Sequence, residues 1–453
     1  MIGMRLEEAA RAIGARLSGA GGTAFAGLST DTRTVAAGEL FIAIRGERYD
    51  GHGFLGTARE RGAAAALVDA RHAGEAGTLP LPALVVEDTR AGLGRLGRHW
   101  REQFSPALVA ITGSNGKTTT KEMLAAIFRA HAGEAGTLAT RGNLNTDIGV
   151  PMTLARLEAA HRYCALELGM NHPGEIAQLA AIAKPTLALV NNAQREHQEF
   201  MASVEAVAEE NASVFESLPA EGVAVLPAED ACAPIFRRKA GARRRIEFGL
   251  EAGDVTGRAA VRPLDSEILL RTPAGEARAT LAIPGLHNVR NALAAAACAH
   301  AAGVPPAAIG EGLTRFRLYS GGLQVNRTGA GATLIDDSYN ANPDSVRAAI
   351  DVLAGCEAPT ALVLGDMGEV GAQGPAFHAE VGRYAKERGV GRLVAFGEAA
   401  RESAAAFGGR HLGDLEGLEA ELAGVRTILV KGSRFMKMER VVQRLTGEKG
   451  GAH

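Results

Sequence analysis

The sequence predicts an α/β protein of three domains: a small α/β domain over residues 1–105, a domain with a parallel sheet over 106–318, and a third α/β domain over 319–453. The chain has 453 residues, whereas one hydrophobic core usually stops growing at roughly 250–300 residues. Apolar strands alternate with Ala-rich helices from residue 106 onward, which is typical of a parallel sheet covered by helices. Hydrophobic residues make up 46% of the chain, enough for several cores.

The first domain is expected to combine short helices and strands. Residues 1–17, MIGMRLEEAARAIGARL, place acids and arginines among apolar residues and predict an amphipathic helix. Single strands are predicted within 25–33 and 38–46. A helix and a strand follow within 54–69, and a last strand within 83–88. These short elements predict a small α/β domain.

The second domain begins with the apolar strand ALVAITG, residues 107–113, which leads into a helix over 117–131. Further apolar strands are predicted at 162–169, 186–192 and 222–227, with helical patterns between them. Residues 246–283 differ, because short alternating strands are separated by turn signals; they predict an antiparallel extension of the sheet.

The third domain starts with a strand and a helix within 332–354. Its other strands are predicted at 358–366, 392–397 and 427–433, and each ends in Gly, Asp or Asn. Ligand loops in open α/β sheets lie at such carboxyl ends. The last residues, 446–453, are expected to be disordered.

Charge and cysteine content exclude several classes of protein. The formal net charge is −2 and no basic stripe is present, which argues against a nucleic-acid partner. No window approaches the roughly 18 uninterrupted apolar residues of a membrane span, and no secretion signal is recognised. The cysteines are widely spaced, which indicates reduced thiols in a cytoplasmic protein. We expect a monomer. The cysteines are Cys164, Cys232, Cys298 and Cys356.

The stretch AITGSNGKTTTKEML, residues 110–124, carries the strongest chemical signal. A strand enters a glycine-bracketed turn, after which Gly116, Lys117 and Thr118 open a helix, an arrangement that suits the phosphates of a nucleotide and a Mg²⁺ ion. The loop is a variant of the Walker pattern, because its first glycine is Gly113. The alternative is a turn whose glycines only permit the bend. The binding candidates are Gly113, Ser114, Asn115, Gly116, Lys117, Thr118 and Thr119.

Two further residues follow neighbouring strands. Glu167 ends one strand and His197 lies just beyond another, so both can reach the carboxyl edge of a parallel sheet near the phosphate loop. A carboxylate and an imidazole there can bind a second divalent cation. The alternatives are a solvated strand end and a surface histidine.

Two Asn-rich motifs are candidates for nucleoside contacts. GLHNVRN places His287, Asn288 and Asn291 at the start of a helix, where Asn288 and Asn291 share a face and suit the edge of a purine. Alternatively, Asn288 is only an N-cap. Asp337 and Asn340 lie at a strand end before a helix capped near Pro343, which suits a ribose contact or a simple turn equally.

Seven stretches, in this order, resemble the Mur ligases of peptidoglycan synthesis. They are TGSNGKTTTKEM, GNLNTDIGVPMTL, ELGMNHPGEI, GLHNVRNALAAAA, DDSYNANPDSV, LGDMGEVG and KGSRFMKMERVV. The resemblance covers about residues 25–445 and is greatest to the member that adds D-alanyl-D-alanine. It implies an N-terminal domain for the UDP end of the substrate, a central P-loop ATPase and a C-terminal Rossmann-like domain.

The resemblance also implies roles for residues. Lys117, Glu167 and His197 correspond to catalytic positions, and Thr118, Glu167 and His197 to Mg²⁺ ligands. Asn288 and Asn291 correspond to adenine contacts and Asp337 to a ribose contact. Positions for the UDP precursor and the peptide substrates correspond to Ser29, Thr30, Asp31, Arg33, Arg45, Gly46, Asn143, Asn145, Thr146, Lys431, Ser433 and Arg434.

The implied reaction is ATP-dependent amide formation between UDP-N-acetylmuramoyl-tripeptide and D-Ala-D-Ala through an acyl phosphate. Neutralising the phosphate charge with Mg²⁺ and Lys117 is then the central requirement. Two alternatives remain: a sibling ligase that adds a different residue, and an ATP-binding regulator that has lost turnover.

Two positions depart from the family pattern. Asn211 stands where the family often has a carbamylated lysine, so Glu209 or Glu210 is a candidate for the missing carboxylate. Gly322 and Ser320 stand where an arginine and a lysine are expected, and Arg317 is the candidate replacement for the arginine.

Overall fold

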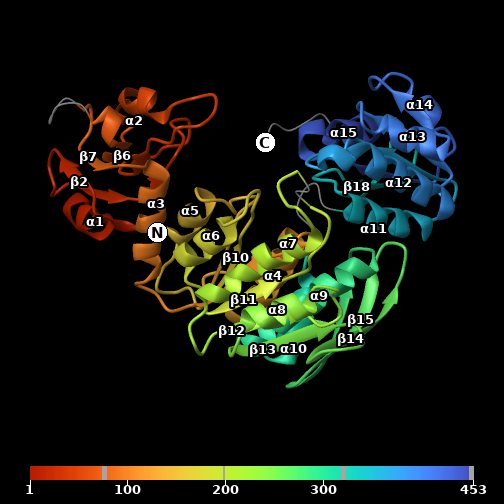
Figure 1. Cartoon of the computed structure of the whole chain (residues 1–453), viewed down its shortest axis with the longest axis horizontal. Coiled ribbons are helices and arrows are strands. Elements are labelled where there is room, and N and C mark those ends of the chain that lie inside the picture. The colour runs from red at the N-terminus through yellow and green to blue at the C-terminus, as the bar shows by residue number, and fades with distance from the viewer. Residues whose placement is uncertain (74–78, 197–198, 318–322, 448–453) are drawn as a thin grey trace.

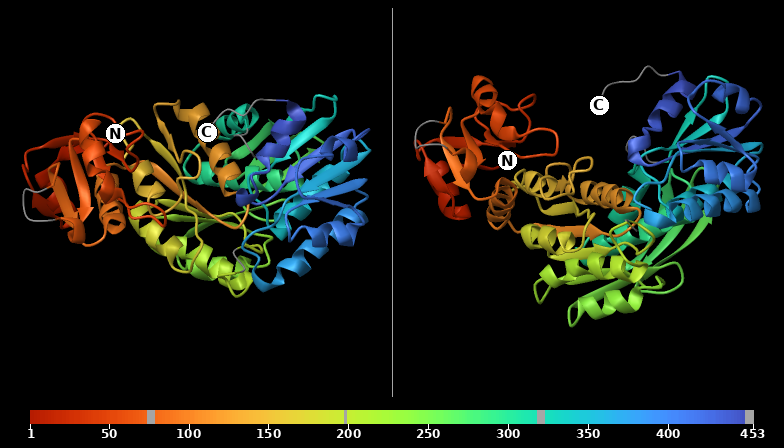
Figure 2. Two further views of the ribbon diagram at one scale, coloured as in Figure 1. Left: turned by 90° about the horizontal axis from the view of Figure 1, so that it is seen from above. Right: turned by 45° about the horizontal axis from the view of Figure 1, so that its top comes forward.

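The computed structural model describes residues 1–73, 79–196, 199–317 and 323–447. The described chain forms three α/β units, with the first and third at opposite ends of the second (Figures 1 and 2). The predicted α/β class with parallel sheets is therefore confirmed. No helix within the described ranges is long and apolar enough to cross a membrane.

The N-terminal unit contains a five-stranded sheet of order β2-β7-β6-β5-β4 and a separate β1-β3 pair. One strand was expected within 25–33, but Gly27, at φ +93°, separates two short strands that belong to different sheets. The strands are β1 (Gly3–Arg5), β2 (Arg16–Ser18), β3 (Ala24–Ala26), β4 (Leu28–Ser29), β5 (Leu40–Ile42), β6 (Ala65–Asp69) and β7 (Ala83–Val86). The helices are α1 (Leu6–Ile13), α2 (Leu55–Glu60) and α3 (Thr89–Arg101).

The central sheet has nine strands in the order β16-β15-β14-β13-β12-β11-β8-β10-β9. Its strands are parallel from β9 to β14, and β15 and β16 add antiparallel at one edge. The antiparallel extension predicted over 246–283 is therefore confirmed from β14 to β16, whereas β13 and β14 pair parallel. The strands are β8 (Ala107–Thr112), β9 (Thr137–Ala139), β10 (Tyr163–Glu167), β11 (Leu187–Val190), β12 (Val223–Pro227), β13 (Arg244–Gly249), β14 (Val255–Val261), β15 (Ser266–Thr272) and β16 (Gly275–Leu281).

Successive residues of β8 bury their side chains on opposite faces of this sheet, as a strand buried on both sides requires. Val109 and Ile111 pack on the face covered by α4, α9 and α10. Leu108 and Ala110 pack on the opposite face, which is covered by α5, α6, α7 and α8. The helices are α4 (Lys117–Ala132), α5 (Gly149–Leu154), α6 (Glu175–Ala183), α7 (Val204–Ala212), α8 (Ala233–Ala240), α9 (Leu286–Ala301) and α10 (Pro306–Arg315).

The C-terminal sheet has the order β17-β18-β22-β19-β20-β21, parallel except for the edge strand β17. Its helix α11 starts at a capping box between Asn342 and Ser345, with Pro343 as the first helical residue, as predicted. The strands are β17 (Gln324–Arg327), β18 (Thr333–Asp337), β19 (Thr360–Leu364), β20 (Arg392–Phe396), β21 (Arg410–Leu412) and β22 (Thr427–Lys431). The helices are α11 (Pro343–Ala354), α12 (Gly374–Glu387), α13 (Arg401–Phe407), α14 (Leu418–Glu421) and α15 (Glu439–Thr446).

Candidate active site

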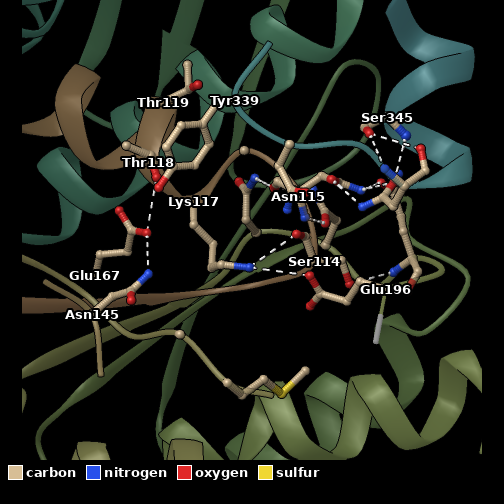
Figure 3. A pocket seen from close by; sticks show the side chains of 18 of the residues that line it. Ser114, Asn115, Lys117, Thr118, Thr119, Asn145, Glu167, Glu196, Tyr339 and Ser345 are labelled. Atoms are coloured by element: carbon tan, nitrogen blue, oxygen red, sulfur yellow. Dashed lines mark hydrogen bonds and ion pairs between the residues drawn. The ribbon is translucent and has the colours of Figure 1, made fainter. Parts of the chain in front are cut away.

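A cavity of about 1340 Å³ lies between the central and C-terminal units, with Glu47 and Arg90 contributing from the N-terminal unit. Its central part is drawn in Figure 3. Most of the residues singled out from the sequence line it: Ser114, Asn115, Gly116, Lys117, Thr118, Thr119, Asn143, Asn145, Thr146, Glu167, His287, Asn288, Asn291, Asp337, Asn340, Lys431, Ser433 and Arg434.

The predicted phosphate loop connects β8 to α4, and both of its glycines are required by the geometry. Gly113 has φ +129°, and a Cβ there would lie 2.9 Å from the Asn191 Cβ. Gly116 has φ +78°, and its Cβ would lie 2.3 Å from the Asn291 Oδ1. Gly116 is also the N-cap of α4, so the loop delivers the amide end of a 16-residue helix to the cavity.

The side chain of Asn211 on α7 holds the first residue of this loop by a hydrogen bond. Its side chain is buried, its Oδ1 accepts a hydrogen bond from the Gly113 amide at 2.8 Å, and its Nδ2 donates to the Val207 carbonyl at 3.1 Å. The residue at the departing family position is therefore part of the loop's scaffold.

Lys117 turns back toward its own loop. Its Nζ donates to the Gly113 carbonyl at 2.5 Å and to the Ser114 carbonyl at 3.1 Å, and it lies 3.4 Å from the Glu196 Oε2 (Figure 3). Sequence reasoning missed Glu196, although its position beside His197 in the loop after β11 is a signal that could have found it. His197 itself lies outside the described residues.

Glu167, at the end of β10, presents a carboxylate that is only partly used. Its Oε1 accepts hydrogen bonds from the Thr118 Oγ1 at 3.1 Å and the Asn145 Nδ2 at 2.9 Å (Figure 3). Its Oε2 is buried and has no hydrogen-bond partner among the described residues. Because buried carboxylate oxygens normally have partners, and Mg²⁺ prefers oxygen ligands, the residues present fit a divalent cation here.

Asn288 and Asn291 belong to a chain of side-chain amides that joins α9 to the phosphate loop. Asn288 donates to the Pro284 carbonyl at 2.7 Å and accepts from Asn291 at 3.1 Å. Asn291 accepts from the Asn191 Nδ2 at 2.9 Å, and that same nitrogen donates to the Asn115 carbonyl at 2.7 Å. The N-cap alternative for Asn288 is wrong, because the cap of α9 is Gly285.

His287 lines the cavity as a neutral group. Burial and the nearby charges of Lys431 and Arg290 lower its pKa to about 4. At neutral pH the imidazole therefore adds no positive charge to a cavity that already contains those two cations.

The C-terminal unit contributes an ion pair to the cavity. The Lys431 Nζ, at the end of β22, lies 2.6 Å from the Asp337 Oδ2, at the end of β18, and donates to the Asn340 carbonyl at 2.8 Å. Burial raises the pKa of Asp337, and the Lys431 charge opposes that rise. Ser433 accepts from the Gly368 amide at 2.6 Å, and the Arg434 guanidinium lies 5.7 Å from the centre of the Tyr339 ring.

The N-terminal candidates do not line this cavity as the structure describes it. Arg33 forms an ion pair with Asp31 at 2.6 Å, and Arg45 one with Asp50 at 3.3 Å. Ser29 donates to the Asp31 carbonyl at 3.0 Å, and the Gly46 amide donates to the Tyr49 carbonyl at 2.9 Å. Thr30 lies between Ser29 and Asp31, directly after β4. All of these residues belong to the first unit, outside the described lining of the cavity.

The suggested replacements at the departing positions have other partners. Glu209 pairs with Arg238 and Lys239 on α8, and Glu210 accepts the Gly174 and Ile176 amides at the start of α6. Neither belongs to the described lining of the cavity, so both are wrong as candidates for a cavity carboxylate in this arrangement.

The candidate arginine is also directed elsewhere. The Arg317 Nη1 donates to the Thr314 and Phe316 carbonyls at 2.9 and 2.7 Å, and Arg317 is absent from the described lining as well. Gly322 and Ser320 lie outside the described residues.

The arrangement is suited to phosphoryl chemistry on a second reactant. A loop of amides with a lysine binds phosphates, a carboxylate beside it fits a cation, and the Lys431–Asp337 pair faces them from another unit. Reactants bound to the two units would meet in one cavity.

Comparison with known proteins gives matches along most of the chain. Residues 24–101 match the Mur ligase family catalytic domain, 111–299 the Mur ligase middle domain, and 323–442 the Mur ligase, glutamate ligase domain. The UDP-N-acetylmuramoyl-tripeptide--D-alanyl-D-alanine ligase of Escherichia coli (strain K12) is 40% identical over 98% of this chain and 99% of its own. The Haemophilus influenzae protein of the same name is 36% identical over the same shares.

Solved structures agree with these matches. A crystal structure of MurF from Acinetobacter baumannii has a TM-score of 0.91 and 33% identity, and the match covers 99% of this chain and 100% of that one. MurF from Thermotoga maritima, solved in complex with ADP, has a TM-score of 0.81 at 24% identity over 93% and 97% of the two chains. At 24% identity, the likeness to the Thermotoga maritima protein is evidence for the fold alone.

Proposed function

This chain belongs to the Mur ligase family, and we propose that it adds D-alanyl-D-alanine to UDP-N-acetylmuramoyl-tripeptide with conversion of ATP to ADP and phosphate. The relatives that match it over nearly their full length carry the name of that ligase. The structural observation that carries the proposal is that a phosphate loop and the C-terminal Lys431 line the same cavity.

Amide formation needs an activated carboxylate. The terminal carboxylate oxygen of the tripeptide attacks the γ-phosphorus of ATP, and the bond to ADP breaks. The amine of D-Ala-D-Ala then attacks the acyl carbon, and the intermediate loses a proton and phosphate to leave an amide. The first step brings an anion to a polyanion, so positive charge at the phosphates is its main requirement.

The phosphate loop supplies that charge in this proposal. The amides of residues 113–119 and the α4 N-terminus bind the β- and γ-phosphates. Lys117 needs only to exchange its two loop carbonyls for phosphate oxygens, because its Nζ already lies above the loop. Glu196 is close enough to attract the lysine back after the products leave.

Thr118 and Glu167, with His197, are the residues we assign to Mg²⁺. The buried Glu167 Oε2, which has no hydrogen-bond partner in the described parts of the chain, supports this assignment. When bound, Mg²⁺ neutralises phosphate charge during the transfer. Asn145 contributes by orienting the Glu167 carboxylate.

The three units divide the substrates among them, with boundaries near residues 105 and 318. The first unit, through Ser29, Thr30, Asp31, Arg33, Arg45 and Gly46, binds the UDP end. Asn143, Asn145 and Thr146, with Lys431, Ser433 and Arg434, contact the peptide substrates, while His287, Asn288, Asn291, Asp337 and Asn340 surround the nucleoside. We place the reaction in the cytoplasm, where ATP is available, and expect a monomer.

The test is phosphate release from ATP with UDP-MurNAc-tripeptide and D-Ala-D-Ala, each substrate omitted in turn, and mass analysis of the product. Release that requires both substrates, with a mass gain of one dipeptide, supports the ligase. If phosphate release instead required a single amino acid in place of the dipeptide, and the product gained the mass of that amino acid, the protein would be a sibling ligase. ATP binding without phosphate release would favour the regulator, whose basis is the departures from the family pattern at Asn211 and Gly322.

A further inference from the structure

One residue of the central unit reaches across to the C-terminal unit. Arg195 lies in the loop after β11, and its Nη2 lies 2.6 Å from the Asp344 Oδ1 while its Nε lies 3.2 Å from the Asp344 Oδ2. The backbone amide of Arg195 also donates to the Asp344 Oδ2, at 2.9 Å. Asp344 is in the first turn of α11, so the carboxylate is held by both the side chain and the backbone of one residue.

The same guanidinium binds a second carboxylate. Its Nη1 lies 2.8 Å from the Glu380 Oε2 and its Nη2 lies 3.1 Å from the Glu380 Oε1, on α12. The guanidinium also lies 5.2 Å from the centre of the Phe377 ring. Hydrogen bonds from Arg195 lower the pKa of Glu380, and those to Glu380 and Asp344 raise the pKa of Arg195, so Glu380 and Arg195 both stay charged near neutral pH.

These contacts differ from an ordinary surface pair. The side chains of Arg195, Asp344 and Glu380 are only 24%, 24% and 29% exposed. Exposed single pairs contribute little, whereas a partly buried guanidinium that binds two carboxylates through its planar fork holds a defined geometry. The three residues together are here called the Arg195 clamp.

The clamp lies beside the phosphate loop. Asn342, two residues before Asp344 and the N-cap of α11, donates from its Nδ2 to the Asn115 Oδ1 at 2.8 Å. The residues on either side of Arg195 also touch the loop: the Gln194 Oε1 accepts from Asn115, and Glu196 lies beside Lys117. A single short segment, 194–196, therefore contacts both the loop and the C-terminal unit.

We propose that Arg195 is a positioning residue that holds the C-terminal unit against the phosphate loop before any nucleotide binds. All the contacts that form the clamp are between atoms of the protein itself. The apparent affinity for a nucleotide is proportional to the fraction of molecules in the binding-competent arrangement. The clamp raises nucleotide affinity because it keeps that fraction high. Only this effect on affinity rests on the proposed function.

The experiment compares Arg195→Ala with Arg347→Ala in the full chain. Arg347 also binds Glu380, at 3.2 Å, but both residues belong to the C-terminal unit. Arg347→Ala therefore removes a positive charge and a contact to the same carboxylate, but it removes no contact between the two units. In small-angle X-ray scattering without ligand, Arg195→Ala should enlarge the radius of gyration, whereas Arg347→Ala should match the unaltered protein.

Calorimetry with ADP gives the second readout. We expect Arg195→Ala to bind ADP about 5- to 150-fold more weakly, the range of a typical coupling between sites, and Arg347→Ala to bind it normally. At saturating ATP the ligands restore the closed arrangement, so KM for ATP should rise with kcat nearly unchanged. The double variant Arg195→Ala/Asp344→Asn should bind ADP only slightly more weakly than the weaker-binding of the two single variants, because both substitutions remove the same contact.

The clamp is refuted if Arg195→Ala and Arg347→Ala have the same radius of gyration and the same affinity. Failure of the proposed function looks different: the unaltered protein would then release no phosphate from ATP with both substrates present, while scattering and ADP binding would still test the clamp. Thermal unfolding of each variant identifies any that fail to fold, and Arg195→Lys, which keeps the charge without the fork, should give an intermediate radius and affinity.

Discussion

The Asn211 side-chain oxygen accepts a hydrogen bond from the Gly113 amide at 2.8 Å, beneath the phosphate loop. The family often has a carbamylated lysine at this position, and its absence suggested a missing carboxylate. In the structure Asn211 instead supplies the acceptor for the Gly113 amide, the first amide of the loop. Its role is therefore structural support of the loop.

Replacing Asn211 by Ala should destabilise the protein by about 1–3 kcal/mol, because the Gly113 amide loses its buried acceptor. ADP affinity should fall as well, since the loop is no longer held in shape. Urea unfolding and calorimetry measure the two effects. Asn326→Ala, on the edge strand β17 of the C-terminal sheet, is the matched control and should change neither. An Asn211→Ala protein with normal ADP affinity would contradict the role assigned here.

Glu167→Gln tests the Mg²⁺ assignment. Glutamine retains an oxygen for Thr118 and Asn145 but carries no charge, so we expect kcat to fall about 10²- to 10³-fold, and ADP binding to lose most of its dependence on Mg²⁺. The controls are Glu209→Gln and Glu210→Gln, whose carboxylates pair outside the cavity and should keep normal Mg²⁺ dependence. If Glu210→Gln shifted that dependence as strongly as Glu167→Gln, the assignment would fail.

Arg317→Ala should leave kcat within about twofold, because its guanidinium donates to the Thr314 and Phe316 carbonyls at the C-terminal end of α10. An arginine that stabilises a phosphoryl transition state contributes roughly 10³- to 10⁵-fold in rate, so the two outcomes are well separated. Steady-state phosphate release decides between them. A loss of 100-fold or more, with unchanged thermal stability, would show that Arg317 moves into the cavity during turnover.

Local patterns predicted the elements that depend on local rules. The strand, glycine turn and helix around Lys117, and the cap near Pro343, follow from residue type and spacing alone. The single strand expected within 25–33 was wrong because one glycine at positive φ redirects the chain, which periodicity does not register. Asn288 was also misjudged as a possible N-cap, since Asn and Gly both suit a helix start and only the backbone decides between them.

Contacts between distant segments were beyond the sequence. Asn211 and Gly113 are 98 residues apart, and Arg195 and Asp344 are 149 apart. No spacing rule connects such pairs, because tertiary packing alone brings them together. Glu196 was missed for a related reason. An acidic residue in a loop is usually solvated, and only the 3.4 Å distance between its Oε2 and the Lys117 Nζ places it at the phosphate loop.

His287 provides a test by pH. Its pKa is lowered to about 4 by burial and the charges of Lys431 and Arg290, while an unfolded histidine titrates near 6.5. The unfolded chain therefore takes up this proton before the folded one does. The stability linked to neutral His287 is fully present above pH 6.5 and is lost as pH falls from 6.5 toward 4.

His287→Gln removes that linkage. Between pH 6.5 and 4 the free energy of unfolding of the variant should fall less than that of the unaltered protein, as measured by urea unfolding at several pH values. In NMR spectra, the imidazole signal that disappears in the variant should titrate near pH 4 in the unaltered protein. A midpoint near 6.5 for that signal would mean that His287 is solvated and does not feel the two cations, and the neutral imidazole assigned to the cavity would then be wrong.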